Sequence, residues 1–285
     1  MEKKPLFISI DFEDIYNDYL FRLNLSESYI VRENFLYESY CVIKNILNKY
    51  YEINNLTYFT TGILAEKTPD LIKQISMDGN EIACHHYLQE NLLNKSKEDF
   101  EKELIKSKLF LSRASEQEVV GYRAPNFCIN DNIGKYLKLV FNHFEYDSSI
   151  FFDLKNDKDF IEQIKRKNKK EYFCYTHNLF FFKKKLRIKT GGTYFRILTK
   201  ELIKRFLQNS VNNGITPIIY LHPYDFMLNK EFWVELDKFD NLNYLKKYYS
   251  YFRQFQWHSL GNNTIESKLE FISRYFKHKG NMKDF

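Results

Sequence analysis

The sequence predicts an α/β domain in which parallel strands form a distorted or incomplete (β/α) barrel of about seven strands. Short apolar runs of strand type alternate with segments of helical periodicity from residue 6 to residue 221, which is typical of a parallel sheet. A charged or imidazole side chain directly follows most of these runs. Because such sheets and barrels bind ligands at the carboxyl ends of their strands, we expect these side chains to share one pocket.

The expected strands are short and end close to the polar residues. They cover residues 6–10, 56–60, 81–84, 119–122, 144–146 and 215–221. The helices between them are expected at about 40–51, 65–77, 97–113, 131–140 and 198–211. Ser96 and Asp99 form a variant of the capping box at the start of the third helix.

Two regions depart from this alternation. Residues 151–190 are rich in lysine, asparagine and aromatic residues, and they predict an insertion with a β-hairpin that covers the site. From about residue 232 the chain is mostly polar, which predicts a helical C-terminal extension. No internal repeat is evident, so we expect residues 1–285 to form a single domain.

Composition narrows the class of protein. With 285 residues, 44% of them hydrophobic, the chain can bury a sizeable core. Its net charge of +6 is modest, and no nucleic-acid-binding motif accompanies the basic residues, so nucleic acid is not expected as a partner. The basic runs at 165–170 and 183–187 are expected to be solvated loops. The alternative is that they form a patch that binds an anionic glycan or a membrane surface.

Cysteine usage and hydropathy predict the compartment. The four cysteines include no CxxC pair, which is typical of reduced cytosolic thiols. No apolar stretch of signal-peptide type follows Met1, and no run of about 18 apolar residues occurs. We therefore expect a cytoplasmic protein that makes peripheral contact with the inner face of the membrane.

Five motifs occur in order along the chain. They are Asp11-Phe12-Glu13-Asp14, Gly121 to Phe127, Tyr146 to Phe151, Gly191 to Leu198, and Tyr220 to Pro223. With them the chain resembles, over residues 5–230, the NodB-like polysaccharide deacetylases, which are the family-four carbohydrate esterases. It is most similar to the subgroup found in exopolysaccharide and exosortase gene clusters. The resemblance implies the NodB homology fold and hydrolytic N-deacetylation of an N-acetylated sugar in a bacterial surface polysaccharide or its precursor.

The resemblance also implies catalytic roles for three residues. Asp11 is expected to be the general base, since a carboxylate at a strand end can take a proton from water. Arg123 is expected to pair with Asp11 and keep it ionised, because a nearby positive charge lowers the pKa of a carboxyl group. His222 is expected to be the general acid, since the imidazole pKa lies near neutral pH.

The resemblance further implies a divalent metal, zinc being the first candidate. Its expected ligands are Asp14, with Glu13 as the alternative, together with His85 and Gln89. Relatives carry a second histidine where this sequence has Gln89. Three interpretations stay open: Gln89 binds the metal through its amide oxygen, His86 or Glu90 replaces it, or the metal is lost.

Tyr122, Pro125, Asp147, Tyr194 and Arg196 are expected to contact the substrate, since they lie in or beside the motifs. Two other functions remain as alternatives. One is a non-catalytic glycan-binding homologue that has lost its metal site. The other is a metal-independent amidohydrolase.

Overall fold

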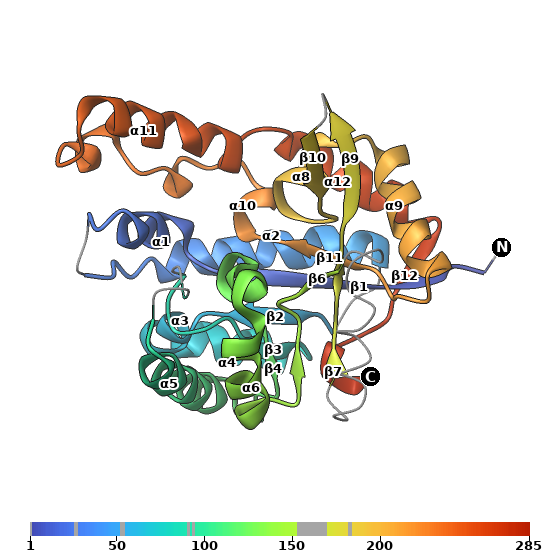
Figure 1. The fold of residues 1–285 in the computed structure, drawn as a ribbon, viewed down its shortest axis with the longest axis horizontal. Coiled ribbons are helices and arrows are strands. Elements are labelled where there is room, and N and C mark those ends of the chain that lie inside the picture. Colours follow the sequence, from blue (N-terminus) through green and yellow to red (C-terminus); the bar gives the residue numbers. More distant parts are fainter. Residues whose placement is uncertain are drawn as a thin grey trace.

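A sheet of parallel strands forms the centre of the computed structural model, which describes residues 2–25, 28–51, 55–89, 92, 95–152, 170–181 and 184–285 (Figure 1). The strand order is β11-β1-β2-β3-β4-β5-β7, and β12 pairs with the start of β1. The outer strands β11 and β7 are not paired with each other in the described part of the chain. The predicted incomplete barrel of about seven strands is therefore confirmed. The strands are β1 (Lys4–Phe12), β2 (Thr57–Thr60), β3 (Glu81–Cys84), β4 (Gly121–Tyr122), β5 (Tyr146–Asp147), β7 (Lys170–Glu171), β11 (Ile218–Leu221) and β12 (Phe276–His278).

Helices cover the outside of this sheet. In Figure 1, α3 to α6 gather below the strands, α8, α9 and α12 lie above them, and α11 projects at the upper left. The α-helices are α1 (Ile15–Arg22), α2 (Glu33–Tyr51), α3 (Gly62–Lys67), α4 (Pro69–Met77), α5 (Lys97–Ser115), α6 (Ile133–His143), α8 (Gly192–Ile197), α9 (Lys200–Asn212), α10 (Pro223–Phe226), α11 (Tyr244–His258) and α12 (Ile265–Ser273). Short 3₁₀ turns are η2 (Pro125–Asn132), η3 (Lys230–Phe232), η4 (Leu236–Phe239), η5 (Asn262–Thr264) and η6 (Met282–Asp284).

The sequence prediction differs from these elements in two places. The single helix expected at 65–77 is two helices, α3 and α4, because Pro69 can begin a helix but cannot continue one. The tail, expected to be helix and loop, also contains the strand β12. Between residues 151 and 190, β6 (Phe151–Phe152) pairs with β8 (Cys174–Tyr175), and β9 (His177–Phe181) pairs antiparallel with β10 (Lys184–Ile188), as in the expected hairpin.

The side chains of the central strands alternate between two environments. Ile8, Ile10 and Phe12 of β1 pack in the main core with side chains of α2, α5 and α9. Phe7 packs in a second cluster with Phe59 and other side chains from inside the barrel. Since successive residues of a strand point to opposite faces, Ser9 and Asp11 share the inner side with Phe7. The alternation therefore directs Asp11 into the barrel.

The strand β12 closes the end of the barrel opposite to Asp11. Its residues Phe276 to His278 lie beside Lys4 to Leu6 of β1. The backbone N–H of Ile8 donates a hydrogen bond of 3.1 Å to Nδ1 of His278, which is 270 residues away in the sequence. The N-terminal strand is thus completed by residues from the far end of the described chain. Among the described residues, no helix is both long and apolar enough to cross a membrane.

Replacing Gly121 of β4 by alanine should lower the free energy of unfolding by about 1–3 kcal/mol, the usual cost of overpacking a core. A Cβ atom at this position would overlap the ring of Tyr146. That ring has little freedom to move, because its hydroxyl donates a hydrogen bond of 2.7 Å to Glu81. Urea denaturation of both proteins measures the loss.

Gly214→Ala is the matched control, since its Cβ would meet no atom within 4 Å. Its only cost is the left-handed backbone at φ +73°, about 1 kcal/mol. A Gly121→Ala variant that is as stable as wild type would contradict the close packing of β4 against β5.

Candidate active site

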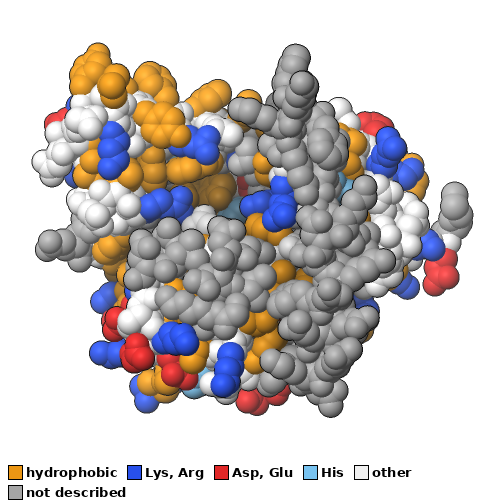
Figure 2. Space-filling view, in the orientation of Figure 1, with side chains coloured by type: hydrophobic (Ala, Val, Ile, Leu, Met, Phe, Trp, Pro, Cys, Tyr) orange, Lys and Arg blue, Asp and Glu red, His pale blue; other side chains and the backbone are white. Residues whose placement is uncertain are grey.

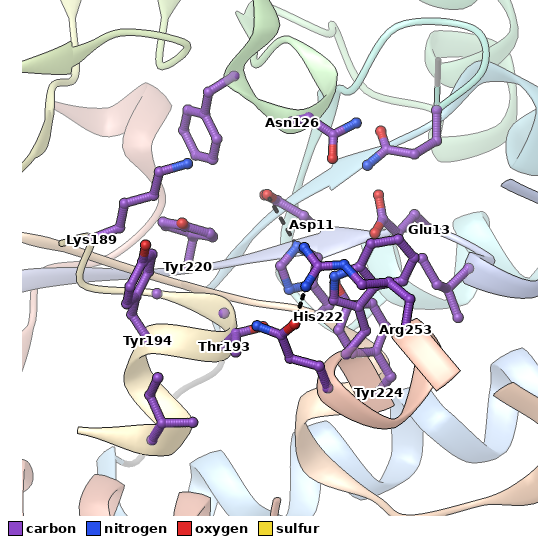
Figure 3. Close-up of a pocket in the computed structure, with 18 of the residues that line it drawn as sticks. Asp11, Glu13, Asn126, Lys189, Thr193, Tyr194, Tyr220, His222, Tyr224 and Arg253 are labelled. Carbon is purple, nitrogen blue, oxygen red and sulfur yellow. Dashed lines mark hydrogen bonds and ion pairs between the residues drawn. The ribbon is translucent and has the colours of Figure 1, made fainter. Parts of the chain in front are cut away.

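A pocket of about 420 Å³ lies at the carboxyl ends of β1 and β11 (Figure 3). Asp11 and Glu13 enter it from the end of β1, and His222 enters it from the end of β11. Gln89 and Tyr194 also line it. The structure therefore brings together side chains from four well-separated segments, as expected for strands that end at one edge of a sheet.

The carboxylate of Asp11 is held by the guanidinium of Arg123, and both side chains are buried. Nη1 of Arg123 donates to Oδ1 of Asp11 at 2.6 Å and to Oγ of Ser9 at 2.8 Å. Nη2 donates to Oγ of Ser148 at 2.9 Å, and the guanidinium lies 3.9 Å from the ring centroid of Phe59. These contacts fix Arg123 and leave Oδ2 of Asp11 directed away from it.

The charges around Asp11 keep it ionised. Burial alone would raise the pKa of its carboxyl group, because the charged form loses water. The positive charge of Arg123, followed by smaller contributions from His85 and His222, outweighs burial and lowers the pKa below its ordinary value. Asp11 is therefore a carboxylate at neutral pH.

His222 is oriented by a chain of buried charges. Its Nδ1 lies 2.9 Å from Oδ2 of Asp225, and its backbone N–H donates to the same oxygen at 2.8 Å. The other oxygen of Asp225 forms an ion pair of 2.7 Å with Nε of Arg196. The imidazole stacks on the ring of Tyr224 with centroids 4.7 Å apart. Its Nε2 consequently faces the pocket, 3.9 Å from Oδ2 of Asp11.

Asp225 also sets the charge of His222. Burial would lower the imidazole pKa, but the hydrogen bond and negative charge of Asp225, with smaller contributions from Glu13 and Asp11, raise it to about 9. His222 is therefore an imidazolium at neutral pH. The pocket holds a carboxylate and an imidazolium that face each other, each fixed by a separate buried ion pair.

Three buried polar atoms near Asp11 have the character of a metal-binding set. Oε2 of Glu13, Nε2 of His85 and Oε1 of Gln89 have no hydrogen-bond partner in the described part of the chain. The first two lie 3.8 Å apart. Nδ1 of His85 lies 2.8 Å from the carbonyl oxygen of Arg123, so it donates there and leaves the lone pair on Nε2. Burial lowers the pKa of His85 to about 4, which keeps it neutral, and raises that of Glu13 to about 7.

This set fits a divalent cation by the chemistry of its donors, which are a carboxylate, an imidazole and an amide oxygen. Within the described ranges, no group of three His, Cys, Asp or Glu side chains is placed to hold a metal. Any site built here therefore depends on the amide oxygen of Gln89. A cation bound there would lie next to Asp11.

Asp14, the expected carboxylate ligand, does not line the pocket. It is the N-cap of α1, where its carboxylate accepts hydrogen bonds from the Tyr16 N–H at 3.2 Å and from Asn17 at 2.9 Å. It also forms an ion pair with Arg32. Because Asp14 caps α1, it does not line the pocket. Glu13, the alternative ligand, lines the pocket instead.

Tyr122 and Arg196 were expected to contact substrate, but the structure places both outside the pocket lining. Tyr122 is buried in the main core, because it precedes Arg123 on β4 and points to the opposite face. Arg196 is buried too: it holds Asp225, and its Nη1 donates to Asn262 at 2.6 Å.

Pro125 and Asp147 also lie outside the lining, whereas Tyr194 is part of it. Pro125 begins η2, and the next residues, Asn126 and Phe127, are the ones that line the pocket. Asp147 accepts hydrogen bonds from the backbone and hydroxyl of Ser149 at 2.8 and 2.7 Å, which orders the loop after β5.

The two proposed substitutes for the second histidine have different outcomes. His86 is fully buried, and its Nε2 lies 2.8 Å from Glu103 of α5. It therefore faces the helices and not the pocket. Glu90 lies outside the described residues.

Several residues that line the pocket, or that orient its side chains from outside the lining, were not predicted from the sequence. Asp225 had a local signal, because it lies three residues after His222 at the start of α10. Lys189 and three residues of α11, Arg253, Gln256 and Trp257, had none. Their place in the lining follows only from the packing of distant segments.

Glycines shape the wall beside His222. A Cβ atom at Gly191 would overlap the ring and carbonyl of Tyr220, and Gly192 has φ +51° with its Cβ position 3.3 Å from His222. Only glycine allows the backbone to approach this closely in that conformation.

Replacing Asp225 by asparagine should lower the pKa of His222 from about 9 toward its ordinary value, since the negative charge is lost. NMR titration of the metal-free protein measures this midpoint. Because the folded pKa is raised, the stabilisation from His222 is complete below about pH 6.5 and lost as the pH rises through about 9.

His278, whose pKa burial lowers to about 4, is the internal control and should titrate alike in both proteins. A His222 midpoint that does not change in Asp225→Asn would show that Asp225 does not set its charge.

Comparison with known proteins adds a family relationship. Residues 38–140 match the family model described as "Polysaccharide deacetylase". No protein with a curated function matches the sequence. A structure from Mycobacterium smegmatis, assigned as a polysaccharide deacetylase, has 16% identity and a TM-score of 0.50, with 97% of this chain and 93% of that chain covered.

Two further solved structures are similar at lower scores. One is a peptidoglycan deacetylase from Bacillus subtilis, with 10% identity, a TM-score of 0.48, and 99% of this chain and 89% of that chain covered. The other is a CE4 family pseudoenzyme from Bacillus anthracis, with 11% identity, a TM-score of 0.45, and coverage of 100% and 69%. Residues 38–140 thus match the polysaccharide deacetylase family model, and nearly the whole chain is similar in fold to the Mycobacterium smegmatis structure.

Proposed function

We propose that this protein is a hydrolase that removes the acetyl group from an N-acetylated sugar of a bacterial surface polysaccharide or its precursor. The family relationship supports deacetylation as the class of activity. The observation that carries the proposal is the pair of Asp11 and His222, which face each other 3.9 Å apart with opposite charges. A pure binding site has no need of a buried base and a buried acid so arranged.

The two residues divide the proton transfers of amide hydrolysis. Water adds its oxygen to the carbonyl carbon of the acetamide, and Oδ2 of Asp11 accepts the proton that water loses. The C–N bond then breaks, and Nε2 of His222 gives its proton to the departing nitrogen. The products are acetate and a sugar with a free amine.

Glu13, His85 and Gln89 would hold a divalent cation, with zinc as the first candidate. When bound, the cation supplies Lewis-acid polarisation of the carbonyl and lowers the pKa of water. One imidazole with two oxygen donors is a harder set than two imidazoles with a carboxylate, so we expect zinc affinity to be weaker than in a two-histidine site.

The pocket walls suit a sugar that carries a negative charge. Tyr194 and Trp257 offer aromatic faces for a sugar ring. Lys189 and Arg253 add positive charge (Figure 3). Burial lowers the pKa of Lys189 to about 8, and in the described part of the chain its ammonium group pairs with no carboxylate. A phosphate or carboxylate on the substrate would stabilise its charged form. Phosphate-linked sugar precursors therefore fit this pocket better than neutral glycans.

Gln89 keeps the two alternative functions open. If it does not bind a cation, the protein is either a metal-independent amidohydrolase or a glycan-binding homologue without activity. An assay of acetate release separates these cases. Metal-free protein is given N-acetylated sugars, some of which carry a phosphate group, and each is assayed in the absence and in the presence of zinc. Release only with zinc supports the proposal, release without it supports the first alternative, and binding without release supports the second.

With an active substrate, Asp11→Asn should abolish acetate release while sugar binding persists, because the base is lost and the pocket is not. His222→Ala should lower the rate by about 10²–10⁴-fold, the usual contribution of a general acid. Initial rates and equilibrium binding measure the two effects.

His143→Ala is the matched control, since this histidine pairs with Glu101 of α5 and takes no part in the pocket. A loss below about threefold in His222→Ala would remove that residue as the acid.

The metal ligands can be tested without activity. Glu13→Gln should weaken zinc binding by at least about tenfold, and Asp14→Asn should leave it nearly unchanged, since Asp14 is occupied by α1 and Arg32. Gln89→His should tighten zinc binding by adding an imidazole donor. Competition with a chromophoric chelator measures all three affinities.

Thermal unfolding controls for damage to the fold, which is expected in Asp14→Asn because a cap and an ion pair are lost. Equal weakening in the two acidic variants, or no response to Gln89→His, would contradict this ligand set.

A further inference from the structure

The helix α11 exposes several large apolar side chains, although its most deeply buried side chains are polar and its Tyr251 and Trp257 pack partly against the body. The residues buried against the body are Ser250, Gln254 and His258. The exposed ones form what we call the α11 outer face: Tyr244, Leu245, Tyr249, Phe252 and Phe255. Leu245 is 80% exposed and Phe252 67%. A surface helix of a monomeric protein has the opposite arrangement, so this face has another use.

The exposed side chains are contiguous and not scattered. Leu245, Tyr249 and Phe252 follow a spacing of four and three residues, which places them on one side of the helix. Leu228 and Leu260, in neighbouring loops, are also exposed. In Figure 2, hydrophobic side chains gather over the region where Figure 1 shows α11. Contiguous patches of this kind mark an interaction site.

Polar contacts hold α11 in place and leave the outer face free. The side chain of Gln254 accepts from the N–H of Val234 at 2.7 Å and donates to its carbonyl oxygen at 3.0 Å. The hydroxyl of Tyr19 donates to the carbonyl oxygen of Ser250 at 2.7 Å. These bonds, together with the packing of Tyr251 and Trp257, position the helix and leave the outer face exposed.

The charges around the outer face favour an anionic partner. Of the nearby carboxylates, Glu231 lies 3.9 Å from Arg32 and Asp240 pairs with Lys247, while Glu235 accepts from the neutral hydroxyl of Tyr16 and Asp237 is exposed. Lys230 and Lys246 form no ion pair within the described ranges. Positive charge thus remains beside the apolar stripe.

We propose that the α11 outer face docks on the surface of a lipid bilayer that carries anionic headgroups. Aromatic and leucine side chains flanked by lysines are the composition of helices that lie in the membrane interface. Lysine is depleted at interfaces between proteins, which argues against a second copy of the chain as the occupant. The overall net charge of +6 adds long-range attraction to an anionic surface.

Docking through this face brings the pocket to the bilayer. The same helix contributes Arg253, Gln256 and Trp257 to the pocket lining. A protein seated on the outer face would therefore hold its pocket mouth next to the headgroups, where a substrate attached to a lipid would be presented. The docking itself does not depend on the proposed hydrolysis.

Sedimentation with vesicles tests the proposal. We expect the protein to bind vesicles of phosphatidylcholine mixed with phosphatidylglycerol more tightly than vesicles of phosphatidylcholine alone. The double variant Leu245→Ser/Phe252→Ser should bind at least about tenfold more weakly, since two large apolar side chains are lost. Lys246→Gln should weaken binding to the anionic vesicles about fivefold.

Ile105→Ser is the matched control, because Ile105 is an apolar side chain on α5 that is 51% exposed and remote in sequence from α11. Its vesicle binding should equal that of wild type. Circular dichroism checks that the variants are folded. If the double variant is unfolded, the vesicle binding of Lys246→Gln tests the proposal instead.

Three results would overturn the proposal. They are the absence of binding to either vesicle, vesicle binding that neither α11 variant changes, and a concentration-dependent dimer that the double variant dissociates. The last would assign the outer face to a second copy of the chain.

Discussion

The buried guanidinium of Arg123 connects the parts of the molecule on which the pocket depends. It bonds Ser9 and Asp11 of β1 through one nitrogen and the Ser148 side chain after β5 through another. Its own carbonyl oxygen fixes His85 after β3. A fully buried charge is tolerated only when its partners are complete, so the arrangement of these three strands is coupled to one residue. Asp11, the proposed base, and His85, a proposed metal ligand, are therefore positioned relative to each other by the same residue.

Much of this could be predicted from the sequence, because the information is local. The alternation of strand and helix predicted the incomplete barrel, and Asp11, Arg123 and His222 were expected close together because each follows an expected strand, while their roles were inferred from the family resemblance. The side-chain direction at such positions is set by the alternation within the strand itself. The same rule, applied to Tyr122 beside Arg123, would have excluded Tyr122 from the pocket.

The remaining predictions failed where tertiary packing or a helix cap decided the position. Asp14 caps the N-terminus of α1. Arg196 forms an ion pair with Asp225, which lies 29 residues further along the chain. Neither competition is visible in a motif. The contribution of α11 to the pocket depends on how a distant segment folds back over the barrel. The exposure of the apolar side chains on its outer face depends on the same packing. A sequence pattern that looks like an ordinary polar tail gives no indication of either.

The position of β1 between β11 and β12 has a consequence for how the chain folds. One edge of β1 finds its partner only in residues 218–221, and on the other edge the start of the strand pairs with residues 276–278, so the central strand depends on contacts between the extremes of the described chain. Such long-range pairing makes folding slow, because a large loop must close before any contact forms. Until then an apolar strand edge stays open to pairing with other chains. Partly folded molecules, and not the native protein, are expected to be the species that aggregates during synthesis at high concentration.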